Sequence, residues 1–175
     1  MFTLFYLNRY TLNNLLNKME KTSVLFICMG NICRSPTAEG VFRHMVQALA
    51  LDNKILTDSA GTHDYHVGDA PDRRAQQAAA RRGYELSDLR GRQVCVEDFS
   101  RFDYILAMDN HNLKILERQC PTEHKHKLRL FLEFSAKFKE GEVPDPYYGG
   151  AHGFENVLDM VEDAAQGLLD EIRKR

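Results

Sequence analysis

The sequence predicts an α/β fold in which a parallel sheet carries helices on both faces. Short runs rich in apolar and β-branched residues alternate with helical patterns along almost the whole chain. Alternation of this kind builds βαβ units, whose strands run parallel and whose connecting helices cover the sheet. A chain of 175 residues is long enough for one substantial core and short for two. We therefore expect a single domain.

The expected strands are short apolar runs bounded by polar or turn-forming residues. They cover residues 23–27, 55–61, 92–96, 102–108 and 127–134. The expected helices show apolar residues at helical spacing, and proline or glycine marks several of their ends. They cover residues 36–50, 71–83, 110–119 and 153–175. Ligands gather at the carboxyl ends of parallel strands, so the loops that leave those ends with unusual residues are the candidate binding loops. They cover residues 28–35, 59–69 and 141–150.

The composition argues against nucleic-acid, membrane and metal partners. The formal net charge is −2 and charge runs are short, so no surface for a polyanion is expected. No apolar run approaches the roughly 18 to 20 residues of a membrane span, so we expect a soluble protein. The four cysteines lack the spacing of a disulfide scaffold or a zinc site, which favours reduced thiols in the cytoplasm. The run HKHK at residues 124–127 has no carboxylate or thiol at ligand spacing, so we assign no metal to it.

Residues 1–18 are apolar but do not have the pattern of a targeting signal. Asn8, Arg9 and two further asparagines interrupt them, and no basic start or small-residue cleavage site accompanies them. Met19 then opens a stretch that leads into the first expected strand. We interpret residues 1–18 as a dispensable extension or a mis-set start, and residues 19–175 as the domain.

The loop after the first expected strand, CMGNICRS, has the features of an anion site. Ser35 is a good N-cap and Pro36 is well tolerated at the first helical position. We therefore expect the next helix to begin there and to point the positive end of its dipole at the loop. Gly30 and Asn31 are residue types that accept left-handed backbone angles, which lets successive N–H groups turn inward. A tetrahedral oxyanion would fit in such a loop.

Cys28 and Arg34 supply the chemistry of that loop. Arg34 offers a planar fork that can bind two oxygens of the anion. Among N–H groups, a helix start and a guanidinium, Cys28 is expected to be largely a thiolate and a nucleophile towards phosphorus. The alternative is a small core cysteine and a solvated helix-start arginine. The strand before this Cys-x5-Arg pattern and the Ser-Pro helix start after it favour the catalytic interpretation.

The segment CMGNICRSPTAEGVF resembles the phosphate-binding loop of the low-molecular-weight protein tyrosine phosphatases, bacterial-type members included. Three further segments resemble later blocks of that family in the same order: SAGTHDYHVGDAPDRRA, FDYILAMDNHNL and PDPYYGGAHGFENVLDMVEDAAQGLL. The resemblance implies a flavodoxin-like, four-stranded parallel sheet with helices on both faces. It also implies that residues 19–175 form a cysteine phosphatase domain without metal or cofactor. The loop residues that would bind substrate are Met29, Gly30, Asn31, Ile32, Cys33 and Ser35.

The resemblance assigns proton transfer to Asp145. A thiolate cannot efficiently expel a phenolate unless an acid protonates the leaving oxygen. Pro144 and Pro146 flank Asp145 and stiffen the loop that presents it. By resemblance, Asp145 gives a proton during phosphocysteine formation and then acts as the base that activates water. An ordinary Asp-Pro turn is the alternative.

Three tyrosines are expected to form walls at the mouth of the site. Tyr147 and Tyr148 follow Asp145, and Tyr65 lies in the second loop. Such walls would make a slot whose depth favours an aryl phosphate over the shorter phosphoserine, while packing in the core or on the surface is the alternative for each. Ile32 stands where relatives that act on phosphoarginine carry threonine, which by resemblance favours phosphotyrosine.

Residues around the loop are expected to support it. Asn31 and Ser35, together with Ser59, can hydrogen-bond one another and hold the loop in shape. Cys33 is either a simple buried thiol or the partner of Cys28 in a protective, reversible disulfide. The family commonly carries a histidine near the position where this chain has Leu89. The tuning of the thiolate therefore departs from the family pattern.

The predicted function is hydrolysis of protein phosphotyrosine and of aryl phosphates. A thiol-dependent arsenate reductase on the same fold would need two more thiols near Cys28, but Cys95 and Cys120 lie far apart in the sequence. A catalytically silent phosphotyrosine-binding module would lack Cys28 or Asp145, and both are present. The expected partners are phosphotyrosine-bearing proteins, with a bacterial tyrosine kinase as one candidate by resemblance. Inorganic phosphate and other oxyanions are the expected small ligands.

Deletion of residues 1–18 should leave activity and thermal stability nearly unchanged, because the first core strand is expected to begin after Met19. The comparison is of melting temperature and of the rate with para-nitrophenyl phosphate for the full and shortened chains. A shortened chain that melts many degrees lower would make the extension part of the core.

Overall fold

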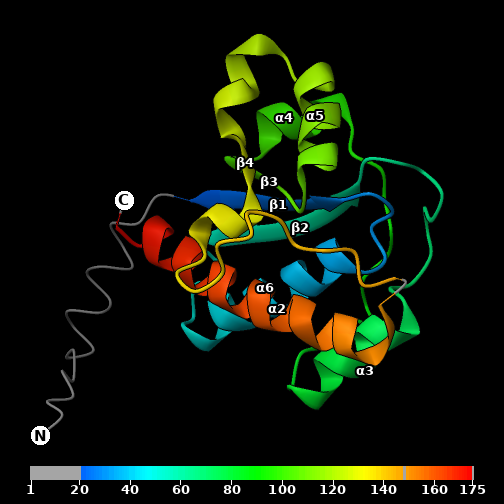
Figure 1. Cartoon of the computed structure of the whole chain (residues 1–175). Helices are drawn as coiled ribbons and strands as arrows, with labels where there is room; N and C mark the ends of the chain where they lie inside the picture. The colour runs from blue at the N-terminus through cyan, green and yellow to red at the C-terminus, as the bar shows by residue number, and fades with distance from the viewer. Residues whose placement is uncertain (1–20, 148, 175) are drawn as a thin grey trace, which may run out of the picture.

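A computed structural model describes residues 21–147 and 149–174, and the predicted extension, residues 1–18, lies outside this part of the chain. Four strands form one sheet in the order β2-β1-β3-β4, and every neighbouring pair runs parallel (Figure 1). The strands are β1 (Thr22–Cys28), β2 (Ile55–Gly61), β3 (Tyr104–Ala107) and β4 (Leu128–Leu130). This order matches the start of the flavodoxin-like order and confirms the predicted fold class.

Helices cover both faces of the sheet. α2 (Arg34–Ala48) and α6 (Gly150–Ile172) lie on one face, and α4 (Val96–Arg101) and α5 (Asn110–Gln119) lie on the other (Figure 1). The short helix α3 (Arg73–Arg81) contacts α6 and α2. Among the described residues, none of these helices has the length and apolarity of a membrane span.

The alternation of side chains along β1 explains why two helical layers are needed. Val24 and Phe26 join the core beneath α2 and α6, whereas Leu25 and Ile27 join the core beneath α4 and α5. All four are fully buried, because successive residues of a strand point to opposite faces. A continuous apolar run is the pattern of a strand that is buried on both faces.

The predicted strand at residues 92–96 is wrong. Gln93 forms only an isolated bridge to Gly61 at the end of β2. The chain then turns into α4, because the Asp98 carboxylate accepts a hydrogen bond from the N–H of Cys95 at 3.0 Å and caps the new helix. A local capping interaction therefore ends the strand after one pair.

The predicted strand at residues 127–134 is half right. β4 ends at Leu130, and a 3₁₀ helix, η2 (Phe131–Phe134), follows it. The Glu133 carboxylate accepts a hydrogen bond from the N–H of Leu130 at 3.1 Å, which favours the helical turn over an extended chain. Another 3₁₀ helix, η1 (Thr122–Lys127), contains the HKHK run.

The start of α2 also differs from the prediction. The helix begins at Arg34, Cys33 is its N-cap, and no side chain caps it. Ser35 is therefore inside the first turn, where its hydroxyl turns towards the Cys28 sulfur instead of the helix N–H groups. Pro36 occupies the third helical position, where no intrahelical N–H donor is yet required.

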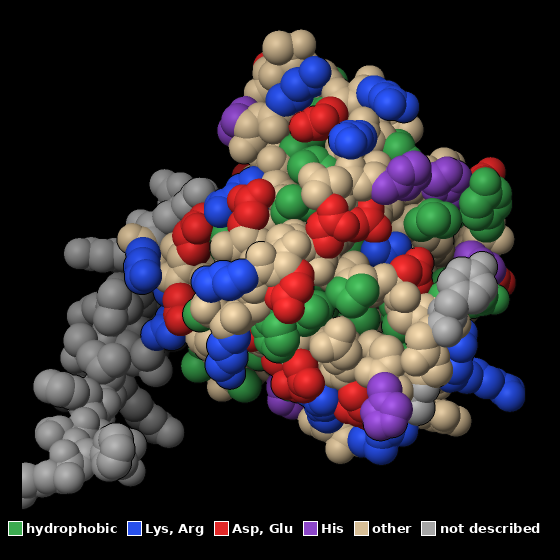
Figure 2. Space-filling view, in the orientation of Figure 1, with side chains coloured by type: hydrophobic (Ala, Val, Ile, Leu, Met, Phe, Trp, Pro, Cys, Tyr) green, Lys and Arg blue, Asp and Glu red, His purple; other side chains and the backbone are tan. Residues whose placement is uncertain are grey.

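The three predicted binding loops meet at the carboxyl end of the sheet. The N–H of Thr62 donates to the carbonyl of Cys28 at 2.9 Å, so the loop after β2 lies against the loop after β1. The N–H of Val143 donates to the carbonyl of Met108 at 2.8 Å, which brings the third loop to the end of β3. Acidic and basic side chains are interspersed on the face drawn in Figure 2, in keeping with the small net charge.

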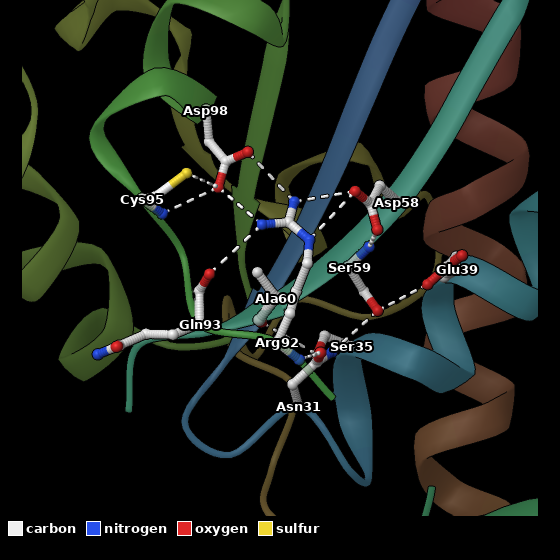
Figure 3. A network of polar contacts seen from close by, with 10 residues as sticks. All are labelled: Asn31, Ser35, Glu39, Asp58, Ser59, Ala60, Arg92, Gln93, Cys95 and Asp98. Carbon is white, nitrogen blue, oxygen red and sulfur yellow. Dashed lines mark hydrogen bonds and ion pairs between the residues drawn. The ribbon is translucent and has the colours of Figure 1, made fainter. Parts of the chain in front are cut away.

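Glu39 is a buried carboxyl group between α2 and β2. It is 7% exposed, and the Ser59 hydroxyl donates to it at 2.6 Å (Figure 3). Burial raises the pKa of Glu39 to about 7, although the Ser59 hydrogen bond opposes the shift. Because the folded protein holds this proton more tightly than the unfolded chain, Glu39 stabilises the fold below pH ~4.5, and this contribution is lost as the pH rises through ~7.

Glu39→Gln should therefore change stability in a pH-dependent way. The amide keeps an acceptor for Ser59 but never ionises, so the variant should match wild type at pH ~4 and exceed it by up to about 3 kcal/mol at pH 8. Urea unfolding at the two pH values measures the difference, with Glu140→Gln at an exposed position as the control. A Glu39→Gln difference that is the same at both pH values would contradict this assignment.

Candidate active site

The loop at residues 28–35 lines a cleft of about 290 Å³ at the carboxyl end of β1. The predicted site residues that line the cleft come from all three loops: Cys28, Met29, Gly30, Ile32, Cys33, Arg34, Tyr65, Asp145 and Tyr147. Asn31 and Ser35 are buried and do not line it. Tyr148 lies outside the described residues.

The sulfur of Cys28 lies at the end of β1 and is surrounded by donors. Cys28 is 3% exposed. The N–H of Asn31 donates to its Sγ at 3.3 Å, and the Ser35 hydroxyl lies 3.1 Å from the same atom. A negative charge on sulfur would be stabilised by these groups and by the nearby start of α2.

Asn31 sets the shape of the loop. Its φ of 56° is left-handed, as predicted. Its side-chain N–H₂ donates to the hydroxyls of Ser35 at 2.9 Å and Ser59 at 2.8 Å, so the hydrogen bonds expected among these three residues are present (Figure 3). The prediction of a left-handed Gly30 is wrong, because Gly30 is not among the residues with positive φ. Gly30 instead allows close approach of His66, whose ring carbon would lie 3.1 Å from an added Cβ.

The hydrogen-bond network behind the loop continues to Arg92, which sequence reasoning missed. The main-chain N–H of Arg92 donates to the side-chain oxygen of Asn31 at 2.9 Å. Its guanidinium lies between the carboxylates of Asp58 and Asp98, at 2.9 and 2.8 Å (Figure 3). Leu89, near which the resemblance implies a histidine, packs instead in a small apolar cluster.

Arg34 is a buried cation that two carboxylates hold. It is 3% exposed, and its guanidinium donates to Asp109 at 2.5 Å and to Asp145 at 3.1 Å. It also donates to the carbonyl of Val143 at 3.2 Å. Burial lowers the pKa of Arg34, but the charges of Cys28 and of the two aspartates outweigh this and raise it. The guanidinium therefore remains charged at the side of the cleft.

Sequence reasoning also missed Asp109 and His66. Asp109 directly follows the apolar run YILAM and caps α5, so its place at the end of a strand was a usable signal. His66 lines the cleft, and its Nδ1 lies 3.0 Å from the Asp69 carboxylate. No sequence motif marks that pair.

The third loop presents Asp145 and Tyr147 at the mouth of the cleft. The Asp145 side chain is 44% exposed, so solvent and ligands can reach its carboxylate. The N–H of Tyr147 donates to the other carboxylate oxygen of Asp145 at 3.1 Å. Tyr65, which also lines the cleft, is largely exposed and stacks on His63 with 5.2 Å between ring centroids.

Cys33 is a buried residue of the loop, and its thiol has a raised pKa. It is 6% exposed, and burial raises the pKa of its thiol to about 12, with Asp72 adding to the effect. Cys33 is therefore a neutral thiol near pH 7. The described residues contain no cluster of three histidine, cysteine or acidic side chains arranged to hold a metal ion.

This arrangement can bind a tetrahedral oxyanion, attack it with sulfur and transfer a proton. The Asn31 N–H and the Arg34 guanidinium supply positive potential, Cys28 brings a thiol to the cleft, and Asp145 supplies an accessible carboxyl group. The groups come from β1, α2 and the third loop, and the sheet brings them together.

Comparisons with known proteins show the family of the chain. Residues 23–175 match the family model of the low molecular weight phosphotyrosine protein phosphatases. A Synechocystis sp. protein named for this family is 47% identical over 152 residues, covering 86% of this chain and 96% of that protein. The human low molecular weight phosphotyrosine protein phosphatase is 40% identical over 151 residues, covering 85% of this chain and 94% of that protein.

A crystal structure of a protein tyrosine phosphatase from Entamoeba histolytica, with Hepes in its active site, has the same fold. Its TM-score is 0.85 at 44% identity, and the match covers 88% of this chain and 98% of that one. These relationships show that the chain is a hydrolase of the phosphotyrosine phosphatase class and that it belongs to the low molecular weight phosphotyrosine protein phosphatase family.

Proposed function

We propose that the chain hydrolyses protein phosphotyrosine through a phosphocysteine intermediate, with Cys28 as nucleophile, Arg34 as oxyanion binder and Asp145 as general acid and base. One observation carries the proposal. A single cleft gathers these three side chains from separate segments, and Arg34 lies 3.1 Å from the Asp145 carboxylate. In the proposed complex, Arg34 binds the phosphoryl group between the Cys28 sulfur and the Asp145 carboxyl group.

In the first step, the Cys28 thiolate attacks phosphorus and the bond between phosphorus and the tyrosine oxygen breaks. Protonated Asp145 gives its proton to the departing oxygen, so the tyrosine side chain of the substrate protein leaves as the neutral phenol. The loop N–H groups and Arg34 bind the equatorial oxygens, where negative charge builds up. The products of this step are a phosphocysteine and the Asp145 carboxylate.

In the second step, water attacks the phosphocysteine. The Asp145 carboxylate takes a proton from the water, the sulfur–phosphorus bond breaks, and the Cys28 thiolate is regenerated with inorganic phosphate as the product. The donors around the Cys28 sulfur make it a good leaving group, because they stabilise the returning negative charge.

The rim of the cleft supports an aryl substrate. Tyr65 and Tyr147 are 70% and 46% exposed and belong to separate loops, so each offers a ring face to a ligand. Ile32 and the half-exposed Met29 add apolar contacts near the loop. A phosphotyrosine side chain places its phosphate at the loop while its ring lies between these walls, and phosphoserine is too short for both contacts. Phosphotyrosine-bearing proteins in the cytoplasm are therefore the proposed substrates.

The arsenate reductase alternative is weaker. It needs additional thiols that can reach Cys28. Cys120 is buried in the core beneath α4 and α5, and Cys95 sits at the start of α4. Burial raises the pKa of both thiols, Glu97 adds to the shift at Cys95 and Lys125 opposes it at Cys120, and the raised pKa disfavours the reactive thiolate.

Cys28→Ser should abolish hydrolysis of para-nitrophenyl phosphate while retaining inorganic phosphate binding, because N–H groups and Arg34 form the anion site. Steady-state kinetics and titration calorimetry measure the two properties, and Cys95→Ser, with full activity, is the matched control. A Cys28→Ser variant that still hydrolyses para-nitrophenyl phosphate would show that Cys28 is not the nucleophile.

Arg34→Lys should lower kcat/KM by roughly 10²-fold or more, since one ammonium cannot replace a bidentate fork aimed at the transition state. The same assay with para-nitrophenyl phosphate measures the loss. Arg43→Lys, at a surface ion pair with Asp88, is the control and should stay near wild type. A near-normal rate for Arg34→Lys would mean that the guanidinium does not bind the reacting phosphate.

Asp145→Ala should slow hydrolysis by roughly 10² to 10⁴, and the loss should grow with the basicity of the leaving group. A nitrophenolate needs little protonation, whereas a phenol as basic as tyrosine needs an acid. The slope of log(kcat/KM) against leaving-group pKa should steepen, and the limb of the pH profile that requires protonated Asp145 should disappear. Glu140→Ala, an exposed carboxylate of the same region, is the control. An unchanged slope would show that Asp145 is a structural turn residue and not the proton donor.

A further inference from the structure

Arg74 reaches from α3 to the loop that carries Asp145. It lies in the first turn of α3, a helix that contacts α6 (Figure 1). Its guanidinium donates to the main-chain carbonyl of Tyr147 at 3.0 Å. Arg74 does not line the cleft, so it has no direct contact with a ligand there.

The main chain of Tyr147 connects Arg74 to Asp145. The carbonyl of Tyr147 accepts from Arg74, and the N–H of the same residue donates to the Asp145 carboxylate at 3.1 Å. A shift of Tyr147 therefore changes the direction in which Asp145 points. The second carboxylate oxygen of Asp145 accepts a hydrogen bond from Arg34 at 3.1 Å.

Two aromatic rings contact the Arg74 guanidinium, one from the third loop and one from α6. It lies 5.1 Å from the ring centroid of Tyr147 and 4.9 Å from that of Phe154. Phe154 is a buried residue of α6, so it provides a fixed surface. Cation–π contacts of this kind favour a single orientation of the guanidinium and of the exposed Tyr147 ring.

Arg74 is also linked to the phosphate-binding loop, through Asp72. Its Nε and Nη2 donate to both carboxylate oxygens of Asp72, at 3.0 and 2.8 Å. The hydrogen bonds from Arg74 hold the pKa of Asp72 below its usual value, so the pair stays ionised at neutral pH. The N–H of Asp72 donates to the carbonyl of Ile32 at 2.8 Å. A continuous line of contacts thus runs from Ile32 to Asp145.

This line becomes more important when substrate binds. In the structure, Asp145 also pairs with Arg34. A bound phosphoryl group competes for that guanidinium and weakens the pair. The contacts of the third loop that do not involve Arg34 include the packing of Pro146 against Gly153 and the line through Arg74.

We propose that Arg74 is a positioning residue that holds the Asp145 loop against the phosphate-binding loop and thereby sets the efficiency of proton donation to the leaving group. The inference rests on the proposed function of Asp145. It explains why a charged pair with a bidentate geometry lies outside the cleft yet contacts the main chain of both catalytic loops.

Arg74→Met tests the proposal, because methionine keeps an apolar stem but removes the donors and the charge. For phenyl phosphates with basic leaving groups, kcat/KM should fall roughly tenfold, and for para-nitrophenyl phosphate it should stay near wild type. Arg74→Lys should lie between the two. Arg81→Met is the matched control, because Arg81 belongs to the same helix and pairs with Glu155 at 2.6 Å. Its slope against leaving-group pKa should parallel wild type.

The same series in an Asp145→Ala background separates the positioning role of Arg74 from the acid role of Asp145. Arg74→Met should add no further steepening there, since the proton donor is already absent. A slope for Arg74→Met that parallels wild type, or an equal loss for every leaving group, would overturn the positioning role even if Asp145→Ala steepens the slope. If Asp145→Ala itself leaves the slope unchanged, the proposed acid fails first.

Discussion

The buried charge of Arg34 is the constraint on which the arrangement of the site depends. A guanidinium that is 3% exposed must find partners inside the protein, because an unpaired buried charge is very costly. Asp109 from the end of β3 and Asp145 from the third loop converge on it. The same interaction thus draws together the carboxyl ends of two strands and a distant loop. It also keeps a cation where an oxyanion can compete for it.

The sheet and the polar network behind the loop provide the rigid frame for this charge. β1 is central and buried on both faces, so its last residue, Cys28, has a well-defined position. Asn31 is held in a left-handed conformation by three hydrogen bonds that lead to Ser35, Ser59 and Arg92. Strained backbone persists only where its surroundings over-determine it, and this network does so. The N–H of Asn31 is consequently held in a fixed position beside the Cys28 sulfur.

Local patterns predicted much of this structure, and interactions between distant residues account for the rest. The helix at residues 110–119 and the strand at 55–61 match their predicted bounds, because periodicity and turn residues mark them clearly. The prediction of a strand at 92–96 was wrong, because the Asp98 carboxylate caps a helix there and favours it over an extended chain. Asp109, Arg92 and Arg74 act on the site across dozens of residues, and their contacts depend on the folded topology. Gly30 serves close packing and not a left-handed turn, a distinction that residue type alone does not make.

The most direct test of the account is to identify the covalent intermediate. Wild-type protein is mixed with para-nitrophenyl phosphate, quenched in acid within milliseconds, digested and analysed by mass spectrometry. The account predicts one phosphoryl group on the peptide that contains Cys28, attached to that sulfur and appearing at the rate of the nitrophenolate burst. A burst with the phosphoryl group on another residue, or turnover in which water attacks the substrate directly and no phosphoenzyme forms, would contradict it.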